Sequence, residues 1–335
     1  MSSWIEASAP ARIDLAGGTL DLWPLHVLHP GSVTINLAID LRALCRVRKR
    51  GSGFRVTVPD LGYERSVTDP KELLADPRAA LAGALLECLG IREPRDIELS
   101  SAVPYGSGLG GSSALTVAMA AALSESIGRP FEGDGRVALV RDVETRVLGK
   151  PAGTQDYYPA LSGGLHVLDF QACGVEVRQS AVDPALWLKH LSLYDTGAAH
   201  SSGMNNWEIF RARLEGDHLV VARLEDVRVA AREMADAVAA GDFRAMGDAL
   251  KREWAARRRL APVVSSPGVD AAIEAAVGAG AWGGKACGAG GGGCVVLLSP
   301  VEKTAAVRES LGRVGEGRLL LVAAENRGLT VGRTG

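Results

Sequence analysis

The feature that most constrains the fold of this chain is residues 104–123, PYGSGLGGSSALTVAMAAAL, in which four glycines and three serines precede an alanine-rich run. Leu115 and Met119 stand at helical spacing and predict a helix that begins at the glycine loop, with Ser112 or Ser113 placed to cap it. Glycines let backbone N–H groups approach a ligand, and a helix N-terminus adds partial positive charge. The segment predicts a site for an anion such as a polyphosphate, because a turn that only caps a core helix rarely needs four glycines and three hydroxyls.

The glycine pattern does not indicate a dinucleotide site. The literal G-x-G-x-x-G occurs twice, at residues 106–111 and 288–293. The second copy precedes a predicted strand instead of a helix, and after the first copy the candidate acid, Glu125, lies on the predicted helix itself instead of at the end of a second strand. No G-x-x-x-x-G-K-[ST] is present, nor are the H-R-D and D-F-G motifs of protein kinases.

Composition excludes several other classes of protein. The 335 residues suggest two domains, and the 37 Lys and Arg residues against 39 Asp and Glu give no net positive field for nucleic acid or anionic lipid. No segment reaches the roughly 18 apolar residues of a membrane span, and the N-terminus lacks a signal-peptide pattern, so we expect a cytoplasmic protein. Five scattered cysteines and the lack of H-E-x-x-H argue against structural zinc, disulfides and a hydrolytic zinc site.

The periodicity predicts an α+β protein. Short β-branched segments come early and indicate an antiparallel sheet, at residues 32–41, 43–50, 54–60 and 96–104. Helical patterns follow at residues 71–90, 137–149, 217–240, 242–260 and 269–281. The break at residues 150–164 separates the helix over 137–149 from further strands, and Gly241 separates the two long helices. Strands with helices on one face are typical of the α+β class.

Three motifs together carry a resemblance to a known family. P-Y-G-S-G-L-G-G-S-S-A resembles the phosphate-binding motif of the GHMP kinases (galactokinase, homoserine kinase, mevalonate kinase and phosphomevalonate kinase). A-P-A-R-I-D-L-A-G-G-T-L-D at residues 9–21 is similar to the first strand and substrate loop of that family, and G-K-A-C-G-A-G-G-G-G-C at 284–294 to its third motif. G-T-Q-D-Y at 153–157 agrees with both in order.

This resemblance implies the two-domain GHMP kinase fold. We expect an N-terminal, ribosomal-protein-S5-domain-2-like domain over residues 1–185 that binds ATP and carries the catalytic aspartate. A C-terminal, ferredoxin-like α+β domain over residues 186–335 would carry the third glycine-rich motif. The implied activity is that of an ATP-dependent phosphotransferase with an alcohol group as acceptor.

Within the family, the chain resembles the sugar and sugar-phosphate kinases, especially those that act on D-glycero-D-manno-heptose 7-phosphate. The resemblance rests on Asp21, G-x-Q-D around Asp156, Y-D-T-G at 194–197, and E-W-x-x-R-R-x-L within residues 251–260. Where those kinases carry a longer glycine run ending in Thr-Asp, this chain has G-G-T-L-D, so the resemblance does not determine the sugar. The alternatives left open are a mevalonate-pathway kinase or decarboxylase of the same family, and a non-catalytic ATP or sugar sensor.

By resemblance, Asp156 is the catalytic carboxylate and Arg12 is the cation beside it. A sugar hydroxyl is a poor nucleophile, and a carboxylate can orient it and accept its proton, while a fixed cation offsets developing negative charge. The implied Mg²⁺ ligands are Glu144 and Ser112, with Ser113 as the alternative serine. From sequence alone, Asp156 could also bond its own turn, and Glu144 could lie on a solvated helix face.

The remaining expectations concern binding residues and partners. The implied ATP-binding residues are Pro104, Gly106, Ser107, Gly108, Leu109, Gly110, Gly111, Ser112, Ser113, Gly288, Ala289, Gly290 and Gly291. The implied substrate-binding residues are Thr19, Asp21, Gly153, Gln155, Tyr158 and Thr196. The basic cluster at 251–260 either binds a phosphate on the substrate or is a solvated helix face. We expect small buried side chains at Cys287 and Cys294, a structural role for His200, and a monomer or homodimer without nucleic-acid or membrane partners.

Overall fold

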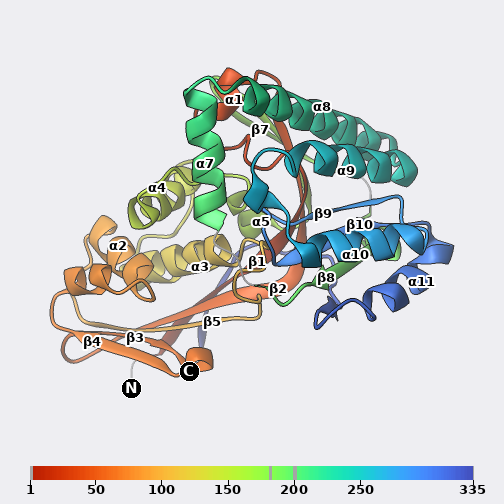
Figure 1. The fold of residues 1–335 in the computed structure, drawn as a ribbon. Helices are drawn as coiled ribbons and strands as arrows, with labels where there is room; N and C mark the ends of the chain where they lie inside the picture. The colour runs from red at the N-terminus through yellow and green to blue at the C-terminus, as the bar shows by residue number, and fades with distance from the viewer. Residues whose placement is uncertain (1–2, 181–182, 199–201, 335) are drawn as a thin grey trace.

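The computed structural model describes residues 3–180, 183–198 and 202–334, which form two β-sheets and their covering helices (Figure 1). The first sheet has eight strands, with β12, β1, β2, β5, β3 and β4 side by side and with β6 and β7 continuing from β2. Its strands are β1 Trp4–Ala16, β2 Val33–Lys49, β3 Phe54–Val58, β4 Tyr63–Val67, β5 Arg95–Ser101, β6 Leu165–Gln171, β7 Gly174–Gln179 and β12 Thr330–Thr334. The second sheet has four antiparallel strands in the order β11, β8, β10, β9. They are β8 Leu191–Asp195, β9 Gly283–Ala286, β10 Cys294–Leu298 and β11 Arg318–Leu320.

Strand β2 corrects one prediction from the sequence. Residues 32–41 and 43–50 were expected to be two strands, but one strand runs through both. Its pairing with β1 shifts register between Pro10 and Ala11. The half of β2 before this irregularity pairs with β6 and the half after it pairs with β5, so the bend joins two parts of one sheet.

Helices cover the sheets on several sides. The helices that precede β8 in the chain are α1 Leu25–Leu28, α2 Ala80–Cys88, α3 Gly111–Ser126, α4 Arg136–Leu148, α5 Tyr157–Ser162 and α6 Pro184–His190. The helices that follow β8 are α7 Ser202–Leu214, α8 His218–Ala240, α9 Phe243–Arg257, α10 Pro267–Gly278 and α11 Val301–Leu311. Figure 1 shows α2, α3 and α4 above β3 and β5, α8 and α9 packed together, and α10 and α11 beside the second sheet.

The expected helix at residues 71–90 is divided. A 3-10 turn covers Pro70–Ala75, and helix α2 begins only at Ala80. Asp76 has an extended backbone, as expected of a residue that precedes a proline, and Pro77 follows it. The predicted single helix was therefore wrong, whereas the helix expected at 137–149 is confirmed as α4 and the break at Gly241 as the left-handed cap that ends α8.

Strand β1 and helix α3 form the centre of the molecule. Every residue of β1 from Ala9 to Ala16 is buried, so this part of the strand lies between packed layers. Ile13 and Leu15 belong to an apolar cluster with α8 and α9, and strand alternation places Arg12 and Asp14 on the opposite face. Helix α3 is buried around most of its circumference, and its run of alanines lets it pack closely on β1 and β2.

The last described strand does not lie with its neighbours in the sequence. Residues 330–334 pair with residues 4–8 of β1, so the chain returns from the second sheet to the edge of the first. Figure 1 shows the two ends of the chain close together.

The division into domains at residue 185 stays a prediction. Among the described residues, no helix is long and apolar enough to cross a membrane.

Candidate active site

The glycine loop before α3 lies against the loop between β9 and β10. Gly108 has a φ of 75°, and an added Cβ would lie 2.3 Å from the carbonyl oxygen of Cys287. The backbone N–H of Cys294 donates to the carbonyl oxygen of Ser107 at 2.8 Å. The structure thus brings together the two sets of residues predicted to bind ATP, at 104–113 and 288–291, although they come from different sheets. Cys287 and Cys294 are buried, as expected.

The start of α3 corrects the predicted helix cap. Gly110, with a φ of 74°, is the N-cap residue, and no side chain caps the helix. Ser112 and Ser113 lie within the first turn, and their hydroxyls donate to Glu144 instead, each at 3.0 Å. The capping role predicted for Ser112 or Ser113 was therefore wrong.

Arg12 and Asp156 form a close ion pair beside the loop. Arg12 Nε and Nη2 donate to Asp156 Oδ1 at 2.9 and 2.5 Å, and Arg12 Nη1 donates to the Gly108 carbonyl oxygen at 2.7 Å. Ser113 Oγ lies 3.4 Å from Asp156 Oδ2. Burial alone would lower the pKa of Arg12, but the carboxylates of Asp156 and Asp14 outweigh burial and raise it. Arg12 is therefore a fixed cation that binds one oxygen of Asp156 and leaves the other toward the glycine loop.

Glu144 accepts hydrogen bonds from four hydroxyl groups. Besides Ser112 and Ser113, Thr116 Oγ1 donates to its Oε1 at 3.1 Å and the Tyr157 hydroxyl donates to its Oε2. Burial and then the nearby Asp156 raise the pKa of Glu144, although these hydrogen bonds oppose the rise. Glu144 is 5% exposed, so it is not a charge on a solvated helix face.

Sequence reasoning missed two of these hydroxyl groups. Thr116 lies four residues after Ser112 and on the same face of α3, and this spacing is visible in the sequence. The contact of Tyr157 with Glu144 had no such signal, because α4 and α5 meet only through the tertiary fold.

Asp21 is held by the segment that precedes Asp156. Its Oδ2 accepts from the backbone N–H groups of Thr154 and Gln155 at 2.8 and 3.1 Å. A Cβ added to Gly153 would lie 2.2 Å from the same oxygen. Asp21 is 3% exposed, and burial followed by the charge of Asp156 raises its pKa to about 6. The predicted substrate residues 21, 153 and 155 are therefore neighbours.

Three other predicted substrate residues lie further apart. Thr19 contacts α7 and α9, where its Oγ1 donates to Asn206 Oδ1 at 2.9 Å. Thr196 Oγ1 donates to the Gly293 carbonyl oxygen at 2.8 Å, which places it beside the β9–β10 loop. Tyr158 is half-buried on α5, and burial raises the pKa of its hydroxyl. His200 lies outside the described residues.

The basic cluster at residues 251–260 is divided between surface and interior. Arg252 and Arg258 are exposed and pair with Glu233 and Asp270. Arg257 is 1% exposed and donates to Glu253 Oε1 at 2.8 and 2.6 Å. The cluster is thus not wholly a solvated helix face, and its role in binding a phosphate stays a prediction.

Two further buried charges complete the group around Arg257. Lys285 Nζ donates to Asp14 Oδ2 at 2.9 Å and lies 3.4 Å from Glu253 Oε1. Burial alone would raise the pKa of Asp14, but Lys285, Arg257 and Arg12 lower it overall. The sequence did not indicate this set of four charges, which we call the buried ion cluster: Asp14, Glu253, Arg257 and Lys285.

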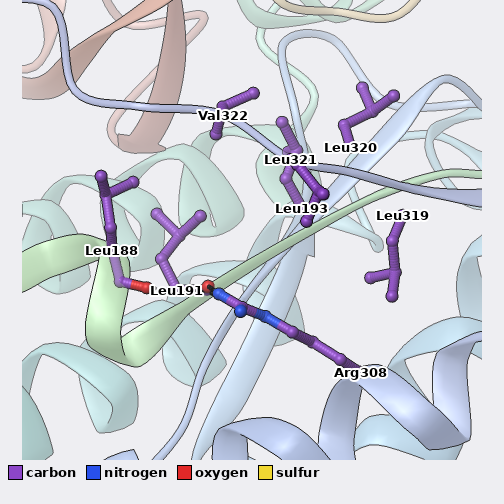
Figure 2. A pocket seen from close by; sticks show the side chains of 8 residues that line it. All are labelled: Leu188, Leu191, Leu193, Arg308, Leu319, Leu320, Leu321 and Val322. Atoms are coloured by element: carbon purple, nitrogen blue, oxygen red, sulfur yellow. Dashed lines mark hydrogen bonds between the residues drawn. The ribbon is translucent and has the colours of Figure 1, made fainter.

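A cavity of about 220 Å³ lies apart from these residues, on the second sheet (Figure 2). Leucines from α6, β8 and β11 line it, together with Arg308 and Val322. The Arg308 guanidinium already donates to the carbonyl oxygens of Leu188 and Leu191 at 3.3 and 2.9 Å. Because Arg308, the one charged side chain among the described residues that line this cavity, is already bonded to backbone carbonyl oxygens, the cavity is unsuited to a polyphosphate.

Comparison with family profiles, known sequences and solved structures gives matches to kinases of one family. Residues 78–164 match the profile of the GHMP kinases N terminal domain, and residues 234–317 match that of the GHMP kinases C terminal domain. The chain is 26% identical to the D-glycero-alpha-D-manno-heptose 7-phosphate kinase of Campylobacter jejuni, over 89% of this chain and 91% of that one. It is 30% identical to the mevalonate kinase of Methanothermobacter thermautotrophicus, over 88% and 90%. A solved D-glycero-D-manno-heptose 1-phosphate kinase from Bacteroides thetaiotaomicron superposes with a TM-score of 0.74 at 21% identity, covering 98% of each chain.

Proposed function

The chain belongs to the GHMP kinase family and has its two-domain α+β fold, and we propose that it transfers the γ-phosphoryl group of ATP to a hydroxyl group of a sugar or sugar phosphate. The observation that carries this proposal is the position of Asp156, which lies with Arg12 and Ser113 at the start of α3. A helix N-terminus with a glycine loop suits phosphate groups, and a carboxylate beside it suits an acceptor hydroxyl.

The ion pair supports a different role for each oxygen of Asp156. Arg12 engages Oδ1 through two nitrogens, so Oδ2 is the oxygen left to accept a proton. In the proposed reaction the acceptor hydroxyl gives its proton to Oδ2, its oxygen bonds to the γ-phosphorus, and the bond from that phosphorus to ADP breaks. Arg12 offsets the negative charge that spreads over the transferring group.

The oxygen donors of the site fit Mg²⁺. Glu144, Ser112 and Ser113 present a carboxylate and two hydroxyls, and Mg²⁺ takes oxygen ligands while retaining waters and phosphate oxygens. A cation here would also offset the repulsion between Glu144 and Asp156 that contributes to the raised pKa of Glu144. When bound, Mg²⁺ supplies positive charge to the phosphate oxygens. Both serines contact Glu144, so either can be the ligand.

The surroundings of Asp21 favour a polyhydroxyl substrate. Asp21 and Asp156 are two carboxylates within one site, and they would repel a carboxylate group of the substrate, such as that of mevalonate, placed beside them. Among the described residues, the buried cations near this site already pair with carboxylates, namely Arg12, Arg257 and Lys285. A sugar hydroxyl can instead donate to Asp21, whose backbone partners bind only Oδ2.

A mevalonate kinase is the second candidate, because a relative of that name is 30% identical to this chain. One ADP-release screen distinguishes the two. Purified protein with ATP and Mg²⁺ is tested against hexoses, heptoses, their phosphates, mevalonate and homoserine. We expect turnover with a sugar or sugar phosphate, and turnover with mevalonate or homoserine alone would contradict the sugar assignment. A cytoplasmic location and a monomeric or homodimeric state stay predictions.

A further inference from the structure

The buried ion cluster lies beneath the loop of residues 17–21, which we call the substrate loop. We propose that Arg257 is a positioning residue, which holds the substrate loop in the shape that presents Asp21 to the acceptor substrate. The inference rests on the proposed function, because it takes this loop to be the part of the site that binds the sugar. Arg257 comes from the end of α9, more than 200 residues away in the sequence.

Three consecutive residues of the loop are bonded from α9. Arg257 Nη2 donates to the carbonyl oxygen of Gly18 at 2.6 Å, and Arg257 Nη1 donates to Thr19 Oγ1 at 3.1 Å. The backbone N–H of Gly17 donates to Glu253 Oε1 at 3.4 Å. Because a guanidinium is a planar fork, its two nitrogens fix both the position and the orientation of the loop backbone.

The loop conformation needs such support. Thr19 has a φ of 75°, and among the described residues it is the one non-glycine residue with a positive φ. A β-branched side chain in this region is strained, and strained backbone persists only where the surroundings hold it. Two groups hold Thr19: Arg257 from α9 and Asn206 from α7. Strain at a substrate loop is also typical of sites that are preorganised for binding.

A purely structural account explains less of the cluster. Lys285 on β9 already pairs with Asp14 on β1 and with Glu253 on α9, so it alone connects the two sheets and α9. Arg257 adds a charge that balances the cluster, with two cations and two anions, all at most 1% exposed. Charge balance does not require the two bonds to the loop, since Arg257 could satisfy Glu253 without them. A role of Arg257 in positioning the substrate loop does account for its bonds to Gly18 and Thr19.

Arg257→Lys is the discriminating variant. It keeps the buried positive charge, so the cluster stays neutral, but an ammonium group cannot reproduce the two-nitrogen fork. Arg257→Met would leave Glu253 short of one cation and risks a failure to fold, which is why the lysine variant carries the test. The matched control is Arg252→Lys on the same helix, where the guanidinium is exposed and binds Glu233.

Two measurements give the answer. Hydrogen exchange in the protein without substrate should be about tenfold faster in Arg257→Lys at the amides of Gly17, Leu20 and Leu22, which bond within or beside the loop. With the sugar selected by the screen, the KM for the sugar should rise about tenfold or more while the KM for ATP changes by less than about twofold. Arg252→Lys should change neither.

The outcomes separate the possibilities. Unchanged loop exchange and an unchanged sugar KM in Arg257→Lys would overturn the inference. A rise in both KM values together with faster exchange across the whole chain would also overturn it, since that is the result of a structural role alone. Faster loop exchange with no sugar turnover in the unaltered protein would count against the proposed function and would leave the positioning of the loop supported.

Discussion

Replacing Gly110 with alanine tests whether the placement of the Arg12–Asp156 pair sets the rate. Gly110 caps α3 with a φ of 74° and a ψ of 22°, a region that costs a residue with a side chain roughly 1–2 kcal/mol. An added Cβ would lie 3.3 Å from Arg12 Cζ and 3.3 Å from Asp156 Oδ2, which is closer than ordinary contact. The pair must therefore shift by a few tenths of an ångström. We expect the free energy of unfolding to fall by about 1–2 kcal/mol and kcat to fall about tenfold.

Gly149→Ala is the matched control for the backbone cost. Gly149 ends α4 with a φ of 63° and a ψ of 21°, and an added Cβ there would meet no atom within 4 Å. Urea unfolding should give similar losses for the two variants, and ADP-release kinetics should show a loss of kcat only for Gly110→Ala. Equal kcat values in the two variants would refute the reasoning. A higher KM for ATP at unchanged kcat would do so as well, because it would place the effect on the nucleotide instead of on the ion pair.

Asp156→Asn and Arg12→Ala should each lower kcat by roughly a hundredfold or more while the circular dichroism spectrum stays unchanged, and near-normal turnover in Asp156→Asn would contradict the assigned base. Asp21→Asn should raise the free energy of unfolding at pH 7 by about 3 kcal/mol, because burial and Asp156 raise the Asp21 pKa from 3.8 to about 6 in the folded chain. The contribution of Asp21 to stability is complete below about pH 4 and is lost as the pH rises through 6, so urea titrations of the two proteins should converge at low pH and differ above pH 6. Ser113→Ala should raise the Mg²⁺ concentration for half-maximal activity more than Ser112→Ala, because Ser113 contacts both Glu144 and Asp156, and equal shifts in the two variants would contradict this expectation.

Local sequence patterns predicted the elements whose limits are set locally. The helix at 137–149 and the break at Gly241 follow from side-chain periodicity and from a glycine that can adopt a left-handed cap. The pattern failed at residues 32–50, where the irregularity opposite Pro10 looks like a break in the sequence but is bridged by pairing with β1. It could not reveal β12, because the pairing partner of that strand is at the other end of the chain.

The candidate site, like the fold, could be predicted from the sequence only in part. The glycine loop could be identified from its residue types and spacing, whereas Asp156 could be identified only through the resemblance of G-T-Q-D-Y to a family motif. The buried ion cluster could not, because its members lie on β1, α9 and β9 and meet only in the folded chain. Arg257 in particular looks like its exposed neighbours in the sequence, and only its contacts with Glu253 and the substrate loop distinguish it.

The pairing of β12 with β1 has a consequence for synthesis of the chain on the ribosome. Strand β1 carries Arg12 and is made early, whereas β12 follows only after the whole second sheet. Until then the amide and carbonyl groups of residues 4–8 at the outer edge of β1 have no strand beside them, and such an edge can pair with another chain. Growing chains that lack residues 330–334 therefore expose an unpaired edge of β1, the strand that carries Arg12. Slow or interrupted synthesis would prolong this exposure and favour aggregation.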